Sequence, residues 1–241
     1  MSIFKKNFYF LLFIVFFLSP ITLIQGQSSE IEAVLTWSTD TYTHPAYYGK
    51  ALPTRKSSVE VVANVFFQEV NPQELIYNWF LDDRIQNENS GEGKQIFRFN
   101  MGGSSAKKSI KLEIKNQEGA TIGQPYYLVI KPQEPEIILK TNSLFNGYFG
   151  ITPKYQVSSN KKIVFSVQPY FFNIKNIEEL NYQWELGEEK AVLTDEKSPD
   201  ILTLEIGQLV NSFTRNLVVK AENKNNPLQK ARLTAEINFK P

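Results

Sequence analysis

The fold is decided by a short pattern that occurs twice, as Tyr77-Asn78-Trp79-Phe80-Leu81 and as Tyr182-Gln183-Trp184-Glu185-Leu186. The tyrosine, the tryptophan and the leucine of the second stretch each lie 105 residues after those of the first. Further apolar residues repeat at this spacing, or at 104 residues in the earlier part of each copy: Leu35 with Leu139, Val59 with Ile163, Val61 with Phe165, Phe97 with Leu202, Phe99 with Leu204, Leu112 with Leu217 and Ile114 with Val219. A near-constant spacing over several blocks predicts two homologous domains.

Both copies alternate apolar and polar residues, as a strand with one buried face does. The alternation is clear in residues 59–65 of the first copy and in residues 233–239 of the second. Turn-forming residues cluster at 87–91 and 223–227, and no long run with a period of 3.6 follows residue 26. Six or seven short strands per copy are typical of an all-β sandwich.

The residues around each tryptophan resemble a known family. Segments 77–83 and 182–188 resemble the Tyr-x-Trp-x-x-Gly-Asp region of PKD-type and related bacterial immunoglobulin-like domains. Segment 109–119 resembles the penultimate strand of that family and the Asn/Gly turn after it. The chain departs from the family at Asp82, which replaces the glycine, and neither copy has the full Asp-Phe-Gly-Asp-Gly turn. The resemblance implies two tandem immunoglobulin-like (PKD-like) β-sandwich domains, and the chain is also similar to tandem sandwich surface proteins of reduced-genome bacteria.

These patterns divide the chain into four predicted segments. Residues 1–26 are a signal peptide or an N-terminal membrane anchor, and residues 27–131 form the first sandwich. Residues 132–135 are a linker that begins and ends with proline, and residues 136–241 form the second sandwich. Two prolines favour a short, stiff, extended connector.

The N-terminal segment has the layout of a secretory signal peptide. Lys5 and Lys6 form a positive region, residues 8–24 are almost unbroken apolar, and Gly26 is a small residue before a polar stretch. The alternative is an uncleaved anchor, because the apolar run is near the minimum length of a spanning helix. Both interpretations export residues 27–241, and contact with the membrane is then expected only through residues 8–24 if they are retained.

The composition excludes several classes of site. The chain has no cysteine and one histidine, His44, so disulfides, thiolate metal sites, a cysteine nucleophile and His-pair zinc sites are absent. Its 26 basic and 25 acidic residues lack the excess of positive charge expected of a nucleic-acid-binding protein. We therefore predict no catalytic residue, no cofactor, no metal and no nucleic-acid partner.

Four aromatic residues of the repeated pattern are predicted to pack in the cores. Trp79 and Trp184 take equivalent positions on central strands, with Tyr77 and Tyr182 two residues before them. A large buried aromatic side chain contributes about 2–3 kcal/mol or more. Core packing is therefore favoured over stacking on a ligand.

The loop of residues 39–55 is the candidate binding loop, since it contains Tyr42, His44, Tyr47 and Tyr48. Aromatic loops at the end of a sandwich can bind sugars or proteins. The alternative is that the loop covers an open strand edge. The aromatic-aromatic-Gly element at residues 47–49 recurs at residues 148–150, which favours the structural role.

Acidic residues offer weaker hypotheses. Asp82 and Asp83, with residues 87–89, make an oxygen-rich hairpin, but its spacing lacks the regularity of a calcium loop, so a solvated turn is favoured. Carboxylate pairs for glycoside hydrolysis occur in any chain with this many acids, and none has a recognisable catalytic context.

The sequence thus favours a non-enzymatic exported protein at the cell surface or in a periplasm-like space. Its expected role is structural, adhesive or protein-binding, with a protein partner in the cell envelope, in a pilus or on another surface. Strand addition at a free edge is one mechanism for such binding. The runner-up is a carbohydrate-binding module that uses the loop tyrosines to bind a glycan.

Overall fold

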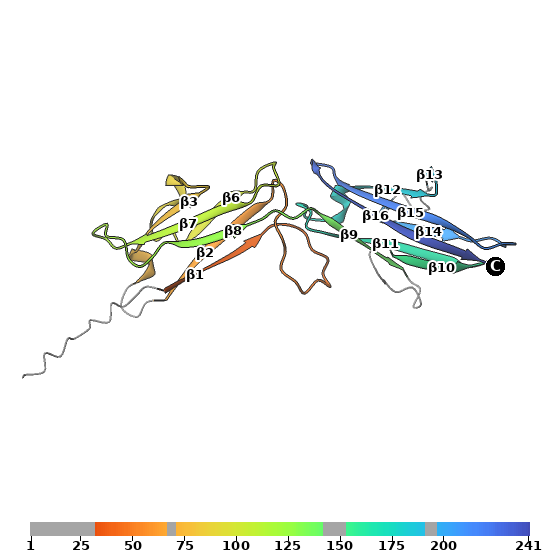
Figure 1. Cartoon of the computed structure of the whole chain (residues 1–241), viewed down its shortest axis with the longest axis horizontal. Coiled ribbons are helices and arrows are strands. Elements are labelled where there is room, and N and C mark those ends of the chain that lie inside the picture. The colour runs from red at the N-terminus through yellow and green to blue at the C-terminus, as the bar shows by residue number, and fades with distance from the viewer. Residues whose placement is uncertain (1–31, 67–70, 142–152, 191–196) are drawn as a thin grey trace, which may run out of the picture.

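The computed structural model describes residues 32–66, 71–141, 153–190 and 197–241. The predicted signal or anchor segment and the aromatic-aromatic-Gly element at residues 148–150 lie outside the described residues. Two β-sandwiches lie end to end along the long axis of the molecule (Figure 1). Among the described residues, no helix has the length and apolar character needed to cross a membrane.

The first sandwich packs two sheets against each other. One sheet has the order β1-β2-β6, and the other has the order β4-β3-β7-β8, with β5 paired to β3. The strands are β1 (Glu32–Thr39), β2 (Ser58–Phe66), β3 (Ile76–Leu81), β4 (Arg84–Ile85), β5 (Gly91–Glu92), β6 (Ile96–Asn100), β7 (Lys108–Lys115) and β8 (Tyr126–Ile130). Short 3-10 helices, η1 (Pro72–Glu74) and η2 (Asn87–Asn89), connect them.

The second sandwich repeats this plan with the same number of strands: it adds β10, and none of its described strands matches β5. Its sheets have the orders β14-β11-β9 and β10-β16-β15-β12-β13, and β10 runs parallel to β16. The strands are β9 (Glu136–Thr141), β10 (Lys154–Ser158), β11 (Lys162–Tyr170), β12 (Leu180–Leu186), β13 (Glu189–Lys190), β14 (Ile201–Glu205), β15 (Phe213–Asn223) and β16 (Asn226–Lys240). The 3-10 helix η3 (Ile177–Glu179) precedes β12.

Each sandwich has its own hydrophobic core, because apolar residues at alternate positions of the longer strands face inward. The first core contains Val59, Val61, Tyr77, Trp79, Phe97, Ile110, Leu112 and Ile114. The second contains Ile163, Phe165, Trp184, Leu202, Leu217, Val219, Ala235 and Ile237. The prediction of an all-β chain with two tandem immunoglobulin-like sandwiches is confirmed.

The predicted equivalences hold for the sheets that contain β2 and β11. Val61 lies opposite Phe97, and Phe165, which is 104 residues after Val61, lies opposite Leu202. The 3-10 helices repeat as well: Asn71 caps η1 and Asn176 caps η3, each with its side-chain oxygen. Local chain geometry is therefore repeated along with the strand pairing.

The equivalence predicted for β7 and β15 is wrong by two residues. Trp79 lies opposite Leu112, but Trp184 lies opposite Val219, so the partner of Leu112 is Val219 and not Leu217. Two residues are one full period of a strand, so the same face of β15 stays buried after the shift. The apolar pattern therefore carried no sign of the difference.

Candidate functional site

The repeated tryptophans lie in the cores with their polar atoms satisfied. Trp79 is fully buried and Trp184 is 3% exposed. The indole Nε1 of Trp79 donates to the carbonyl oxygen of Lys94 over 2.9 Å, and that of Trp184 donates to Pro199 over the same distance. Each acceptor follows its tryptophan by 15 residues, so the two rings are held by the same device.

The tyrosines of the pattern differ between the two copies. Tyr77 is fully buried, and its hydroxyl donates to the carbonyl oxygen of Pro72 over 2.9 Å. Tyr182 is partly buried and packs against the second core, and its hydroxyl oxygen is buried without a hydrogen-bond partner among the described residues. Burial raises the pKa of Tyr182, and the charge of Asp200 and the nearby Tyr42 add to this effect.

Three of the four predicted loop residues contact the second domain. The backbone N–H of Tyr42 donates to the carbonyl of Phe172, and the N–H of Phe171 donates to the carbonyl of Tyr42, each over 2.7 Å. The ring of Tyr47 packs edge-on against Tyr170, with centroids 5.4 Å apart, and it packs against Phe171 in the same way.

His44 and Tyr48 complete the loop. The Nε2 atom of His44 lies 3.0 Å from the side-chain amide of Gln168, on strand β11 of the second domain. The Nδ1 atom of His44 accepts from the N–H of Ala46 over 3.1 Å. Tyr48 is fully exposed, so it alone among the four is free to meet a ligand.

Buried amides of the second domain bind the backbone at the end of this loop. Gln229 Nε2 donates to the carbonyl oxygen of Arg55 over 2.7 Å, and Asn226 Nδ2 donates to the same oxygen over 3.2 Å. The Oε1 atom of Gln229 accepts from the N–H of Asn173 and from Asn223 Nδ2, both over 2.8 Å. Gln229 is fully buried, so these bonds are shielded from water.

We call this contact region the junction, made of residues 41–57 of the first domain and residues 168–173 and 223–229 of the second. Neither sequence interpretation of the loop included it. Residues 223–227 were predicted to be a turn, and they are the tip of the β15–β16 hairpin that reaches the first domain (Figure 1). The cluster of Asn223, Asn225 and Asn226 in one turn is the one signal of the junction that the sequence offered.

The second half of the loop lies along the linker. The N–H of Gln133 donates to the carbonyl oxygen of Pro53 over 2.7 Å. Pro53 lies 104 residues before Val157 of β10, which pairs with Phe239 of β16. The bond between Gln133 and Pro53 therefore corresponds to part of the β10–β16 pairing of the second domain. Two prolines, Pro53 and Pro132, limit this pairing because neither has an N–H to donate.

The acidic hairpin of the first domain forms a turn. Asp82 has a φ of 48°, in the region that glycine favours, and its counterpart Gly187 has a φ of 67°. Asp82 Oδ2 pairs with Lys108 Nζ at 2.7 Å, and Oδ1 accepts from the N–H of Ser109. These hydrogen bonds, led by that from Lys108, lower the pKa of Asp82. Within the described ranges, no group of three or more His, Cys, Asp or Glu residues is placed to hold a metal ion.

A row of large side chains crosses the outer face of the sheet β4-β3-β7-β8. The strand register aligns Ile85, Phe80, Lys111 and Tyr127 on four neighbouring strands. Ile85, Tyr127 and the adjacent Val129 are 48%, 68% and 56% exposed. Lys111 Nζ lies 3.9 Å from the centroid of the Phe80 ring and pairs with Glu113. We call Ile85, Phe80, Tyr127 and Val129 the apolar row.

The corresponding positions of the second domain are mostly polar. Glu185, Val218 and Thr234 form the matching row on β12, β15 and β16. Val218 is buried, and Glu185 forms an ion pair with Lys220 at 2.7 Å. The two copies share a fold but present different outer faces.

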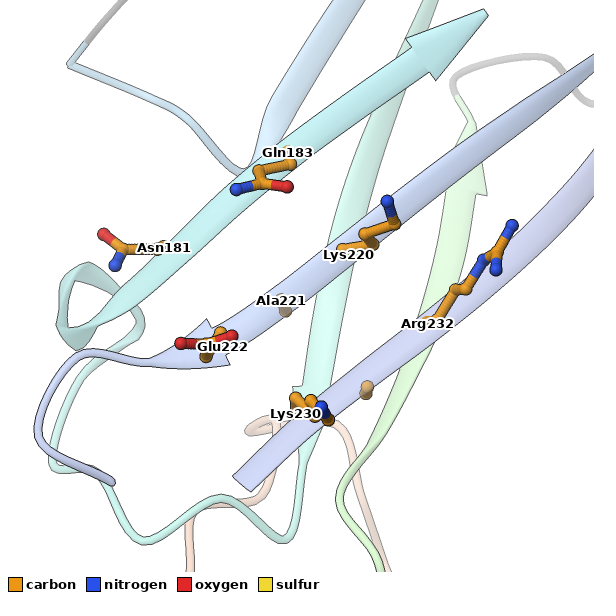
Figure 2. Close-up of a pocket in the computed structure, with 8 residues that line it drawn as sticks. Asn181, Gln183, Lys220, Ala221, Glu222, Lys230 and Arg232 are labelled. Atoms are coloured by element: carbon orange, nitrogen blue, oxygen red, sulfur yellow. The ribbon is translucent and has the colours of Figure 1, made fainter. Parts of the chain in front are cut away.

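A groove with a volume of about 470 Å³ lies on the outer face of β12, β15 and β16 (Figure 2). Two rows of side chains border it in the strand register. The first row consists of Asn181, Glu222 and Lys230, and the second of Gln183, Lys220 and Arg232. Ala221 and Ala231 complete the lining. β16 has 15 residues, whereas its counterpart in the first domain, β8, has 5. The groove therefore lies on a part of the β15–β16 hairpin that has no paired strand at the corresponding place in the described part of the first domain.

No family model and no curated protein sequence matches the chain. Among solved structures, the chain is similar to the three N-terminal domains of the Highly Immunogenic Outer Capsid protein of bacteriophage RB49. This match has 16% identity and a TM-score of 0.44 over 87% of this chain, which spans 59% of the phage chain. It is also similar to the fibronectin(III)-like modules of Clostridium thermocellum CbhA, with 12% identity and a TM-score of 0.28 over 85% of this chain and 93% of that chain. A third similar structure is Bacteroides ovatus SGBP-B in complex with a mixed-linkage heptasaccharide, with 11% identity and a TM-score of 0.25 over 83% of this chain and 47% of that chain. By its own strand orders and cores, the chain consists of two tandem immunoglobulin-like sandwiches.

Proposed function

We propose that the protein is a non-enzymatic, exported binding protein that acts at the cell surface or in the cell envelope and holds a protein partner on its first domain. The apolar row is the observation that carries this proposal. Clustered exposed apolar side chains on a soluble domain mark interaction sites, and Tyr127 and Val129 lie next to each other on one strand that ends the sheet.

The internal repeat supports this choice. If the outer face needed apolar residues for folding, both copies would carry them, but Glu185 and Thr234 stand where the first domain has Phe80 and Tyr127. The fold therefore tolerates polar residues there. The apolar row is better explained by a partner than by stability.

The junction gives the proposed binding protein a fixed shape. Hydrogen bonds from buried amides hold Arg55, and ring contacts hold Tyr47, against the second domain. Residues 132–135 therefore do not act as a free hinge in this proposal. A rigid pair of sandwiches places the first domain at a constant distance from whatever holds the rest of the chain, as an adhesive or structural role requires.

Export through residues 1–26 is part of the proposal and rests on the sequence pattern. The carbohydrate-binding alternative has less support, because Tyr42 and Tyr47 pack in the junction and leave Tyr48 as the exposed tyrosine of the loop.

Photo-crosslinking in the cells that make the protein tests the proposal. Tyr127 is replaced with p-benzoylphenylalanine in the full chain, and Thr234, its counterpart in the second domain, is replaced in a matched control. We expect one discrete crosslinked protein from position 127 and none from position 234. Absence of an adduct at position 127, or the same adduct at both positions, would contradict the proposal.

A further inference from the structure

The groove on the second domain carries an electrostatic arrangement that the fold does not need. Lys220 and Arg232 lie directly opposite each other on β15 and β16. Like charges in directly opposed positions of a sheet destabilise it. Glu185 pairs with Lys220 and offsets one of the two charges, but Arg232 forms no ion pair with any described residue.

Lys230 adds a further cation at the edge of the groove. It lies opposite Glu222, yet the two form no ion pair within 4 Å in the described part of the chain. Three cations and one acid therefore line the groove. An anionic ligand bound by Arg232 and Lys230 would offset the charge of Arg232, which pairs with no described acid, and gain charge-assisted hydrogen bonds.

The remaining side chains of the groove indicate which kind of anion fits. Asn181 and Gln183 stand two residues apart on β12 and face the same side (Figure 2). Each amide offers donors and an acceptor, a combination suited to the hydroxyl groups of a sugar. The lining contains no aromatic residue and no aliphatic residue larger than alanine, so it lacks the apolar anchors that fill pockets at the centre of protein-binding hot spots.

From this arrangement we infer that the groove binds an acidic glycan, a saccharide chain that carries carboxylate groups. Arg232 and Lys230 bind the carboxylates, and Asn181 and Gln183 bind the hydroxyl groups. The volume of about 470 Å³ lies within the range of small-molecule sites, so it holds a short saccharide segment. This site is separate from the apolar row, so the outcome of its test is independent of the outcome of the test for protein binding.

The groove is held in shape by the junction. Residues 223–229 at the tip of the hairpin that carries it are fixed to the first domain through Gln229 and Asn226. A site made of hydrogen-bonded strands with a fixed hairpin tip is preorganised, which lowers the entropic cost of binding.

Titration calorimetry of the full chain with tetragalacturonate, a hyaluronan tetrasaccharide and an alginate tetrasaccharide tests the inference. Galactotetraose is the neutral control, and hexaglutamate is the peptide control. We expect saturable binding of at least one carboxylated saccharide, weakening as salt rises. No binding of galactotetraose is expected.

The double variant K230Q/R232Q is then compared with K140Q/K162Q, which removes the same charge from exposed lysines on β9 and β11. Loss of two charge-assisted hydrogen bonds should weaken binding by about ten-fold or more in the groove variant and by less than about two-fold in the control. The inference is overturned if none of the acidic saccharides binds, if both variants lose binding equally, or if hexaglutamate binds as tightly as the saccharides.

Discussion

Gln229 of the second domain donates a hydrogen bond to the carbonyl oxygen of Arg55 in the first domain, and the glutamine side chain is fully buried. Two residues 174 positions apart in the sequence are thereby joined across the junction. A buried amide that satisfies a backbone carbonyl in another domain is costly to remove, because each group left behind loses its partner and cannot reach water. The pair therefore links the stability of the chain to the arrangement of its domains.

The first prediction concerns this link. Gln229→Ala leaves the Arg55 carbonyl with the longer bond from Asn226 and removes the acceptor of Asn173 and Asn223. We expect a loss of about 1–3 kcal/mol, which scanning calorimetry reports as a fall of about 2–4 °C in the midpoint per kcal/mol. The exposed Gln208 is the matched control, and Gln208→Ala should change the midpoint little. Equal midpoints for the two variants would show that the junction contributes nothing to stability.

The second prediction separates two neighbouring tyrosines of the candidate loop. Tyr47→Ala removes both ring contacts with Tyr170 and Phe171, whereas Tyr48→Ala removes a side chain that is fully exposed. Aromatic pairs contribute about 0.5–1.5 kcal/mol each beyond area burial, so Tyr47→Ala should destabilise the chain. It should also broaden the distribution of interatomic distances that small-angle X-ray scattering gives, because the two domains are held less firmly. Tyr48→Ala should leave both unchanged. If Tyr48→Ala alters the scattering as much as Tyr47→Ala, the junction is described wrongly.

The third prediction uses the repeated tryptophans. Trp79→Phe and Trp184→Phe each remove the indole donor to a backbone carbonyl, at Lys94 and at Pro199. Because the geometry is the same in both copies, the two variants should lose similar stability, on the order of 1–3 kcal/mol each. Denaturation followed by circular dichroism measures both losses. A loss confined to one variant would contradict the equivalence of the two cores.

The fourth prediction concerns pH. The bond from Lys108 lowers the pKa of Asp82 below its ordinary value of 3.8, so the ionised carboxylate stabilises the fold above that value. This stabilisation is lost as the pH falls through the lowered pKa in the folded state. Asp82→Asn keeps a residue that tolerates the positive φ.

The measurement is the difference in unfolding midpoint between wild type and Asp82→Asn at a series of pH values. The unfolding midpoint of the wild type should rise relative to that of Asp82→Asn from pH 2 to pH 5, and the difference should then stay constant. Any effect of the substitution on the backbone adds the same offset to the difference at every pH. A difference that does not vary over this range would mean that the pair with Lys108 contributes no stability.

The fold was predictable because its signals are local and periodic. In a strand with one buried face, apolar and polar residues alternate, and the repeated tryptophan pattern showed that there are two homologous domains. The two-residue shift between Leu112 and Val219 escaped detection because it preserves that alternation. The sequence comparison also placed Asp82 correctly at the glycine position of the turn, since Asp82 has a positive φ like that of its counterpart Gly187.

The candidate surfaces were less predictable because they depend on strand register. Ile85, Phe80 and Tyr127 come from three strands, and they form a row only once the strands are paired. The same holds for Lys220 and Arg232 in the groove. The junction depends on Gln229 and Arg55, which lie in non-periodic segments of different domains, so the cluster of amides at the tip of the hairpin was its one signal in the sequence.

Binding of the crosslinked partner to the purified full chain shows whether the apolar row is a protein-binding surface. Wild type is compared with Tyr127→Glu and with Thr234→Glu, the equivalent change on the second domain, after calorimetry shows that each variant is folded. The change removes the most exposed ring of the apolar row and puts a carboxylate into an apolar contact, so binding should weaken by about 100-fold or more. Thr234→Glu should bind as wild type does. Unchanged affinity for a folded Tyr127→Glu variant would mean that the partner does not bind at the apolar row.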